Sequence, residues 1–301
     1  MSVQPAPAAE ADVDVCICTF RRATLTDTIQ SIARQRGFDG RLRIIVADND
    51  ETPSASEQVD RLRAIGQDIA YVHAPARNIS IARNACLDQA TAPLVAFIDD
   101  DEIADEYWLA ELLAAMRRPG IDAVFGPVQA VYDPAAPAWM KSADLHSTRP
   151  VDTHQGIDTG YTSNALVRRS AIADLRFDLS LGRSGGEDTD LFTRLYARGS
   201  RFGAAPRGIV REQVTPSRMS LQWLAQRAFR SGQTHARRFL GSPATRIKAA
   251  VVALSKAAAC GVIAITRLGS PSGWRRAVVR GSLHLGATSR LLGLRDRQIY
   301  G

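Results

Sequence analysis

Short apolar runs alternate with amphipathic stretches along residues 13–126 of this chain. A short run of Val, Ile and Phe is typical of a buried strand, whereas apolar positions three or four apart are typical of a helix. The expected strands are 13–19, 42–47, 69–73, 94–98 and 123–125, and the expected helices are 24–36, 54–65, 79–89 and 106–117. This alternation predicts an α/β fold in which a mostly parallel sheet has helices on both faces.

The regular alternation ends at Gly126. Residues 127–160 are rich in Pro, Asp and His, and a loop of this length is usually functional in a compact domain, so we expect it to line the substrate pocket. A further strand is expected at 161–168, a helix that the stretch 182–190 opens and that runs to about Ala197, and a polar helix at 221–239. We therefore expect a main domain at 13–240, a helical region at 241–301, and a disordered leader at 1–12 without the features of a signal peptide.

The net charge of +7 is concentrated in the C-terminal region. Residues 244–301 carry ten Lys and Arg against the single acid Asp296, so this region has a charge of +9 and residues 1–243 have −2. A basic region of this kind attracts an anionic surface, either membrane lipid or nucleic acid.

Residues 249–266 are almost wholly apolar and about long enough to span a bilayer. A charge at the centre of such a segment, here Lys256, costs about 2.5–3.5 kcal/mol on insertion. We therefore expect a helix that is buried against the body or lies in the membrane interface, rather than a spanning helix. A plain helical hairpin with solvated arginines is the alternative.

The four cysteines and five histidines show no spacing typical of a disulfide framework or a metal site. Cys16 and Cys18 alternate along the first expected strand and point to one face, where their apolar neighbours indicate core packing. Such cysteines suit a reducing cytosol, so we expect a cytoplasmic protein.

Four carboxylates, Asp99 to Glu102, follow directly on the expected strand 94–98. Clustered carboxylates repel one another, and hard oxygen ligands select Mg²⁺ or Mn²⁺, which favours a phosphate-bearing substrate. A solvated acidic turn before the next helix is the alternative. Polar clusters at 19–22 and 48–51 also follow expected strands. Because ligands bind at the carboxyl ends of the strands in such sheets, the three clusters together predict one site.

Together these motifs resemble those of the family 2 glycosyltransferases of the GT-A fold, over roughly residues 13–240. The segments that carry the resemblance are strand 13–18 with Thr19-Phe20-Arg21-Arg22, strand 44–47 with Asp48-Asn49-Asp50, Asn78 with Ala82-Arg83-Asn84, the DXD position Asp99-Asp100-Asp101, Gly186-Glu187-Asp188, and the basic motif Gln226-Arg227-Ala228-Phe229-Arg230. This variant looks most like bacterial enzymes of surface-polysaccharide assembly, such as the succinoglycan-type glycosyltransferases.

The resemblance implies a nucleotide-sugar donor, with UDP favoured and GDP and dTDP left open. It implies that Asp101 binds the metal, and that Asp99 shares the metal or contacts the ribose. Many relatives carry a His near residues 210–214, where this chain has Glu212 as a replacement oxygen ligand for Mg²⁺ or Mn²⁺. The residues expected to bind the nucleotide sugar are Thr19, Phe20, Arg21, Asp48, Asp50, Asn78, Arg83, Asp99, Asp100, Arg227 and Arg230.

Several of these roles have plainer alternatives. Asp48 is expected to hydrogen-bond the nucleobase, but a turn or helix-cap role would suit it too. The guanidinium groups of Arg21 and Arg83 are suited to phosphates, although Arg83 could equally be a surface helix charge. Arg227 and Arg230 lie three apart on one helical face, which suits a diphosphate or an anionic acceptor. As an isolated pair they would more often be solvated.

Transfer with inversion, which the resemblance implies, needs a base that takes the proton of the acceptor hydroxyl. Asp188 is the expected base, and Glu187 is expected to bind or position the acceptor. The alternative is that both acids merely favour a helix N-terminus after flexible glycines. The expected acceptor is a glycan or a lipid-linked oligosaccharide at the inner face of the cell membrane, because the basic, apolar tail suits peripheral attachment.

Three other functions compete with this prediction. The first is a non-enzymatic nucleotide- or glycan-binding protein with a decayed site, which the intact acidic pairs disfavour. The second is a dehydrogenase, whose Gly-x-Gly-x-x-Gly should follow the first strand, where Thr19-Phe20-Arg21-Arg22 stands instead. The third is nucleic-acid binding through the arginines of the tail, which the lack of an aromatic stacking platform disfavours.

Overall fold

The computed structural model describes residues 12–152 and 156–294. The expected leader, apart from Asp12, lies outside the described residues, as do the last seven residues of the tail.

A seven-stranded sheet forms the centre of the body, in the order β3-β2-β1-β4-β8-β6-β9. Strands β3, β2, β1 and β4 run parallel, β8 is antiparallel to both of its neighbours, and β9 is parallel to β6. The strands are β1 (Val13–Thr19), β2 (Leu42–Asp48), β3 (Ile69–His73), β4 (Leu94–Ile98), β6 (Ala123–Phe125), β8 (Asn164–Arg168) and β9 (Phe202–Ala204). The predicted mostly parallel, mixed sheet is confirmed.

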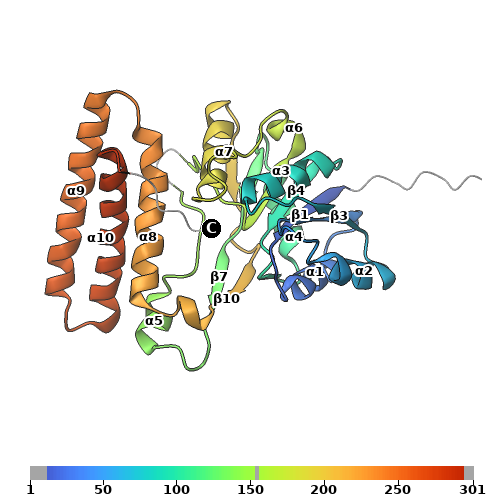
Figure 1. Ribbon diagram of the computed structural model, residues 1–301, viewed down its shortest axis with the longest axis horizontal. Coiled ribbons are helices and arrows are strands. Elements are labelled where there is room, and N and C mark those ends of the chain that lie inside the picture. The colour runs from blue at the N-terminus through green and yellow to red at the C-terminus, as the bar shows by residue number, and fades with distance from the viewer. Residues whose placement is uncertain (1–11, 153–155, 295–301) are drawn as a thin grey trace, which may run out of the picture.

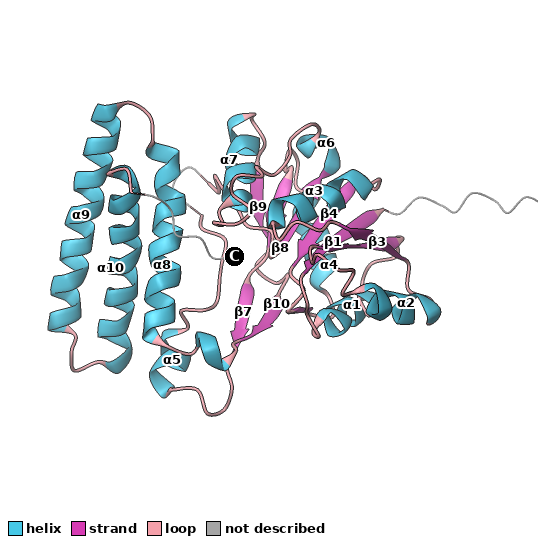
Figure 2. Ribbon diagram, in the orientation of Figure 1, coloured by secondary structure: helices cyan, strands magenta, loops and turns pink. Residues whose placement is uncertain are grey.

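Helices cover both faces of this sheet, as the alternating pattern predicts (Figure 2). One face packs against α1 (Leu25–Ala33), α2 (Ser56–Ala64) and α4 (Trp108–Met116). The other face packs against α3 (Ile79–Gln89), the short α6 (Arg169–Ile172) and α7 (Glu187–Ala197). Alternate residues of each strand point to opposite faces, so Val15 and Ile17 join the first core and Cys16 joins the second.

A smaller, three-stranded sheet in the order β5-β10-β7 extends the body toward the C-terminal helices. Its strands are β5 (Glu102–Ala104), β7 (Val128–Val131) and β10 (Val210–Gln213), and α5 (Ala138–Ala143) follows β7. These elements correct the expectation of an irregular stretch at 127–160. Strands of three or four residues are too short to show an alternating pattern, which is why they were not expected. The strand expected at 161–168 begins only at Asn164.

Three long helices stand side by side at one end of the molecule and form what we call the helical unit (Figure 1). They are α8 (Leu221–Ala236), α9 (Pro243–Thr266) and α10 (Pro271–Leu291), and the 3₁₀ turn Arg237–Phe239 follows α8. Each begins at a serine, and Ser220, Ser242 and Ser270 accept a hydrogen bond from a backbone N–H of the first turn. This capping satisfies amide groups that would otherwise lack a partner, so the sequence marks the start of all three helices.

Small residues bring α8 and α10 into backbone contact. A Cβ atom on Gly232 would overlap the carbonyl oxygen of Leu283, and one on Gly286 would overlap that of Phe229. The buried side chains of the helical unit are mostly alanines, including Ala236, Ala250 and Ala253. The three helices therefore pack closely while covering little apolar surface.

The outer face of α9 is apolar and exposed. Its most apolar 18-residue window has a mean hydropathy of 1.9, and only 17% of that window is buried. Among the described residues, α9 is the one helix with the length and composition to cross a membrane. Of the two placements expected for this segment, burial against the body is therefore not observed. Ile247, Val251 and Ile265 are each more than half exposed.

Candidate active site

Five carboxylates converge where β4 leaves the main sheet, and we call them the acidic cluster. Asp99, Asp100 and Asp101 follow β4, and Glu102 begins β5. The antiparallel pairing of β5 and β10 places Glu212 directly opposite Glu102. Strand register thus brings Glu212, which the family resemblance indicates as a replacement for a His, next to the DXD carboxylates.

Crowding in the acidic cluster disfavours negative charge. Loss of contact with water raises the pKa of Asp99 to about 7, and the charges of Asp101, Asp100 and Glu212 add to this effect, whereas Arg83 opposes it. Although 44% of the Asp99 side-chain surface is exposed, its carboxyl group lies close enough to these neighbours for their charges to act on it. Burial likewise raises the pKa of Asp100 to about 6 and raises the pKa of Glu102.

Two arginines partly neutralise the acidic cluster. Arg22 lies 3.6 Å from Asp100 and 3.4 Å from Asp101, and Arg218 lies 3.6 Å from Asp101 and pairs closely with Glu212. Within residues 12–152 and 156–294, no group of three or more His, Cys, Asp or Glu side chains is arranged to hold a metal ion. A metal at this place would therefore need further oxygen ligands from a bound substrate.

The loops after β1 and β2 are tied together by a bidentate ion pair. The Arg21 guanidinium donates to both carboxylate oxygens of Asp50, at 2.8 and 3.0 Å. This bond holds the pKa of Asp50 at about 2. Phe20 is exposed, and the Arg21 guanidinium lies 5.3 Å from the centroid of its ring. Thr19 is buried at the end of β1. Arg21, expected to meet phosphate, thus already has a carboxylate partner.

Asp48 is fully buried and holds the next loop in place. Its carboxylate accepts hydrogen bonds from the backbone N–H of Asp50 at 3.1 Å and of Ala55 at 2.7 Å, and from the Tyr71 hydroxyl at 3.0 Å. With no exposed surface and both oxygens engaged, Asp48 fits the turn-and-cap alternative rather than a nucleobase contact.

Helix α3 fixes the segment that leads to the Gly-Glu-Asp motif. Asn78 caps the helix by accepting from the Ser80 N–H, and its amide group donates to the Leu179 carbonyl at 2.9 Å. Ser80 donates to the Asp178 carbonyl at 2.7 Å, and Asn84 makes two hydrogen bonds to the backbone of Phe177. Asn78, expected to bind the donor, therefore positions the later acidic motif.

Arg83 joins the acidic cluster to that motif. Its guanidinium pairs closely with Glu187 and lies 3.7 Å from Asp99, and the side chains of Arg83 and Glu187 are only 9% and 7% exposed. Burial raises the pKa of Glu187 and Arg83 opposes this shift. Burial disfavours the Arg83 charge, but Glu187, Asp99 and Asp188 outweigh it and raise its pKa. Arg83 is thus a buried link between both acidic motifs, not a surface charge.

A cavity of about 440 Å³, which we call the site cavity, lies between α7 and α8 and is lined by Asp188. Asp188 is in the first turn of α7, and the predicted basic residues Arg227 and Arg230 lie on the facing side of the same cavity. Hydroxyl groups form much of the remaining wall, from Thr148, Thr159, Tyr161, Ser163, Ser184, Thr189, Ser231 and Thr234. This wall suits a polyhydroxylated ligand, and Asp188 is the one carboxylate residue among those that line the cavity.

An aromatic stack that sequence reasoning missed supports the basic residues. His146 stacks on Trp223 with ring centroids 5.4 Å apart, and Arg227 and Arg218 lie 5.6 and 5.8 Å from the Trp223 ring. Arg227 also donates to the His146 carbonyl at 3.2 Å. The loop 127–160 thus reaches the site through His146 and Thr148, as expected of a functional loop.

Comparison with known proteins agrees with this arrangement. The sequence model of the family described as "Glycosyl transferase family 2" matches residues 14–176, which is more than half of the chain. The chain belongs to glycosyltransferase family 2. It is 47% identical over 296 residues to the succinoglycan biosynthesis protein ExoM of Rhizobium meliloti, and the match covers 96% of both chains. The expected enzyme class and family are thereby confirmed.

The chain is also similar to more distant proteins, one by sequence and one by structure. A glucosyl-dolichyl phosphate glucuronosyltransferase of Haloferax volcanii is 24% identical, over 73% of this chain and 75% of that protein. The mannosyltransferase PcManGT of Pyrobaculum calidifontis, solved with GDP-Man and Mn²⁺, superimposes with a TM-score of 0.64 at 19% identity, over 97% of this chain and 90% of that one. The predicted GT-A fold is confirmed.

Proposed function

We propose that this family 2 enzyme is a metal-dependent, inverting glycosyltransferase that moves a sugar from a UDP-sugar to a glycan or lipid-linked oligosaccharide in polysaccharide biosynthesis. The observation that carries the proposal is the placement of Asp188 in the hydroxyl-lined site cavity, linked through Glu187 and Arg83 to the acidic cluster. The role of the ExoM relative in succinoglycan biosynthesis supports the polysaccharide assignment.

The donor would lie against the acidic cluster. Mg²⁺ and Mn²⁺ prefer oxygen ligands, and Mg²⁺ is commonly held by one or two carboxylates together with substrate phosphates. One or two of Asp99, Asp101 and Glu212 would supply such oxygens together with the diphosphate of the donor, and a cation there would relieve the repulsion among carboxylates that contributes to the raised pKa of Asp99. The metal would neutralise charge on the departing diphosphate. A distant neighbour of the same fold binds GDP-Man and Mn²⁺, which supports this ligand class.

The acceptor would occupy the site cavity. The Asp188 carboxylate would take the proton of an acceptor hydroxyl. The oxygen of that hydroxyl forms the new bond to the anomeric carbon as the bond from this carbon to the diphosphate oxygen breaks. Glu187 is already paired with Arg83, so its role is to hold the start of α7 rather than to meet the acceptor. Arg227 and Arg230 would face the anionic groups of the substrates.

The enzyme would act in the cytoplasm at the inner face of the cell membrane. The exposed apolar face of α9 and the excess of Lys and Arg around it are the features of an interfacial helix. A related protein acts on a glucosyl-dolichyl phosphate, so a lipid-linked acceptor has precedent among its relatives.

Release of nucleoside diphosphate from a panel of nucleotide sugars tests the proposal, in the presence of Mn²⁺, Mg²⁺ or EDTA. We expect slow hydrolysis of one donor, UDP-linked, that EDTA and Asp101→Ala both abolish. Donor binding is followed by calorimetry in the same samples, because turnover without an acceptor is slow. Absence of binding to every nucleotide sugar would contradict the proposal. Donor binding and hydrolysis that EDTA leaves unchanged would contradict metal dependence.

A further inference from the structure

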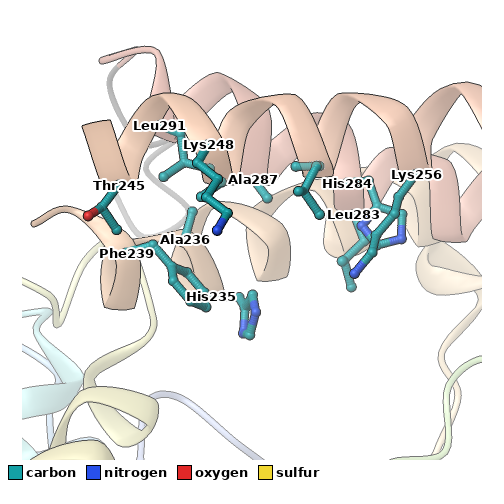
Figure 3. Close-up of a pocket in the computed structure, with 13 residues that line it drawn as sticks. His235, Ala236, Phe239, Thr245, Lys248, Lys256, Leu283, His284, Ala287 and Leu291 are labelled. Atoms are coloured by element: carbon teal, nitrogen blue, oxygen red, sulfur yellow. The ribbon is translucent and has the colours of Figure 1, made fainter. Parts of the chain in front are cut away.

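A second cavity lies within the helical unit, and we call it the cationic groove (Figure 3). It has a volume of about 350 Å³ and is open to solvent along its length. Residues of all three helices line it, and most of its wall is apolar, from side chains such as Val252, Leu283 and Leu291. None of the expected site residues lies in it.

Two lysines and two histidines gather along this apolar wall. Lys248 and Lys256 of α9, His284 of α10 and His235 of α8 all border the groove, and Figure 3 shows Lys256 beside His284. Loss of solvation lowers the pKa of His284, and the charges of Lys256 and Arg280 lower it further. Removal from water also lowers the pKa of His235, as do Arg238, Lys256 and His284, while Asp158 opposes them.

No carboxylate of the helical unit balances these groups. Residues 221–294 contain no Asp or Glu, and their twelve Lys and Arg are Arg227, Arg230, Arg237, Arg238, Arg246, Lys248, Lys256, Arg267, Arg275, Arg276, Arg280 and Arg290. The carboxylate that acts on His235, Asp158, is already paired with Arg238 at 2.5 Å. A groove with a cationic rim and an apolar wall is complementary to a ligand with an anionic head and a hydrocarbon chain.

The cationic groove meets the site cavity at one residue. His235 lines both cavities, so the groove and the cavity that holds Asp188 adjoin each other at this side chain. On its other side the groove is bounded by α9, whose outer face carries exposed Ile247, Val251 and Leu254. The groove therefore connects an apolar surface to the site cavity.

We propose that the cationic groove binds a lipid phosphate, with the charges of Lys248 and Lys256 on its rim attracting the phosphate and the lipid chain along the apolar wall of Val252 and Leu283. The ligand is the lipid that carries the acceptor glycan, and this part of the inference rests on the proposed function. The groove then anchors the acceptor while its sugar reaches Asp188. An amine that meets phosphate near a membrane contributes about 1 kcal/mol, so two lysines correspond to a change in affinity of about thirtyfold.

The test is flotation of the full chain with three kinds of phosphatidylcholine vesicle: pure, with a polyisoprenyl phosphate, and with phosphatidylserine at the same surface charge. We expect the intact protein to prefer the polyisoprenyl phosphate vesicles, and Lys248→Gln/Lys256→Gln to lose about thirtyfold in affinity for them. Gln keeps a high helix propensity, and circular dichroism checks that α9 remains folded.

The matched control is Arg267→Gln/Arg276→Gln, which removes the same charge from exposed positions outside the groove, one at the C-terminal end of α9 and one on α10. It is expected to change the affinity by less than about threefold. Equal losses in both double variants, or equal binding to phosphatidylserine vesicles, would overturn the proposal in favour of a general anionic surface. If calorimetry shows that inorganic phosphate binds as tightly as the polyisoprenyl phosphate vesicles, the lipid chain contributes nothing to binding, and a lipid ligand would be contradicted.

These measurements need no turnover, so they are independent of donor release. Loss of donor binding by the intact protein would contradict the proposed function and leave the flotation result standing. Normal donor binding without a preference for the lipid phosphate would contradict the groove and leave the proposed function standing.

Discussion

The sheet body and the helical unit are built on opposite plans. The body buries its large side chains, such as Ile17, Trp108 and Phe192, between a sheet and its covering helices. The helical unit buries alanines and glycines and exposes large apolar groups such as Val251 and Ile265 along α9. A body of the first kind is stabilised by the removal of apolar surface from water, whereas the second plan leaves a surface that needs an apolar or lipid environment.

Charge divides the two regions in the same way. Acids and bases of the body meet in specific pairs, including Arg21 with Asp50 and Arg83 with Glu187. The helical unit has basic residues and no acids between residues 221 and 294. The site cavity lies at the junction, with Asp188 from the body and Arg227 and Arg230 from the helical unit. Catalysis is therefore expected to depend on both regions, and stability on each in a different way.

The largest effect is expected from the base on the body side of the junction. Asp188→Asn removes the group that takes the acceptor proton, so transfer should fall by about 10²–10⁴-fold while donor binding is retained. Steady-state transfer and donor calorimetry measure the two properties. Asp190→Asn, two residues along the same helix and paired with Arg194, is the control and should change transfer by less than about twofold. Equal losses in both variants would remove Asp188 from the proposed role.

Breaking the buried pair of the body should have the next largest effect. Arg83→Met leaves Glu187 buried without its counter-charge, so the free energy of unfolding should fall by about 3–5 kcal/mol. The control is Arg176→Met, which breaks the exposed pair between Arg176 and Asp88. Asp88 lies on α3, as Arg83 does, and the free energy of unfolding is expected to fall by about 1 kcal/mol or less. Urea unfolding of both variants measures the difference, and a similar loss in the two would show that burial does not strengthen the pair.

The small-residue packing of the helical unit gives a smaller expected change. Gly286→Ala places a methyl group against the Phe229 carbonyl, so overpacking should lower the free energy of unfolding by about 1–3 kcal/mol. Gly261 lies in α9 with nothing within 4 Å of an added Cβ. Gly261→Ala should therefore stabilise the protein by about 0.5–1 kcal/mol, because Ala has the higher helix propensity. Thermal unfolding measures both variants. A change of the unfolding temperature in the same direction for Gly286→Ala and Gly261→Ala would contradict the close contact of α8 and α10.

The smallest effect concerns pH and separates a paired charge of the body from an exposed one. Asp50 has a pKa of about 2 in the folded protein, below the value of about 3.9 of an unfolded chain. Its contribution to stability is thus present above pH 4 and is lost as the pH falls toward 2. Asp50→Asn should lower the unfolding midpoint in urea at pH 7, and the gap from the wild type should close on acidification.

Glu57→Gln is the control for this titration, because the Glu57 side chain is 88% exposed. It should leave the midpoint almost unchanged at every pH. A gap between wild type and Asp50→Asn that stays constant from pH 7 to pH 2.5 would contradict the role of the Arg21 pair in holding Asp50 ionised.

Much of the body could be predicted from the sequence, because its signals are local. The apolar runs at β1, β2, β3 and β4 and the carboxylates that end β4 are contiguous, so the strands and the DXD position need no knowledge of tertiary contacts. Glu212 is indicated only by the family resemblance, and the register of β5 and β10 shows that it lies at the acidic cluster.

What the sequence could not provide is the partner of each charged group. Arg83 and Glu187 are 104 positions apart, and nothing in either segment indicates that they meet. Asp48 ends a strand as a nucleotide-binding residue would, but the donors from Ala55 and Tyr71 give it a structural role that only the folded loop reveals. Thr148 and Thr159, which line the site cavity, come from a loop without periodicity. The exposure of α9 likewise depends on which of its faces α10 covers.

The central claim is that Asp188 activates an acceptor hydroxyl for a single displacement at the anomeric carbon. Proton NMR of the first transfer product tests it most directly, since the coupling of the anomeric proton reports the configuration of the new bond. The account predicts a product with the configuration opposite to that of the donor. Retention of the donor configuration would contradict a single displacement and the role assigned to Asp188.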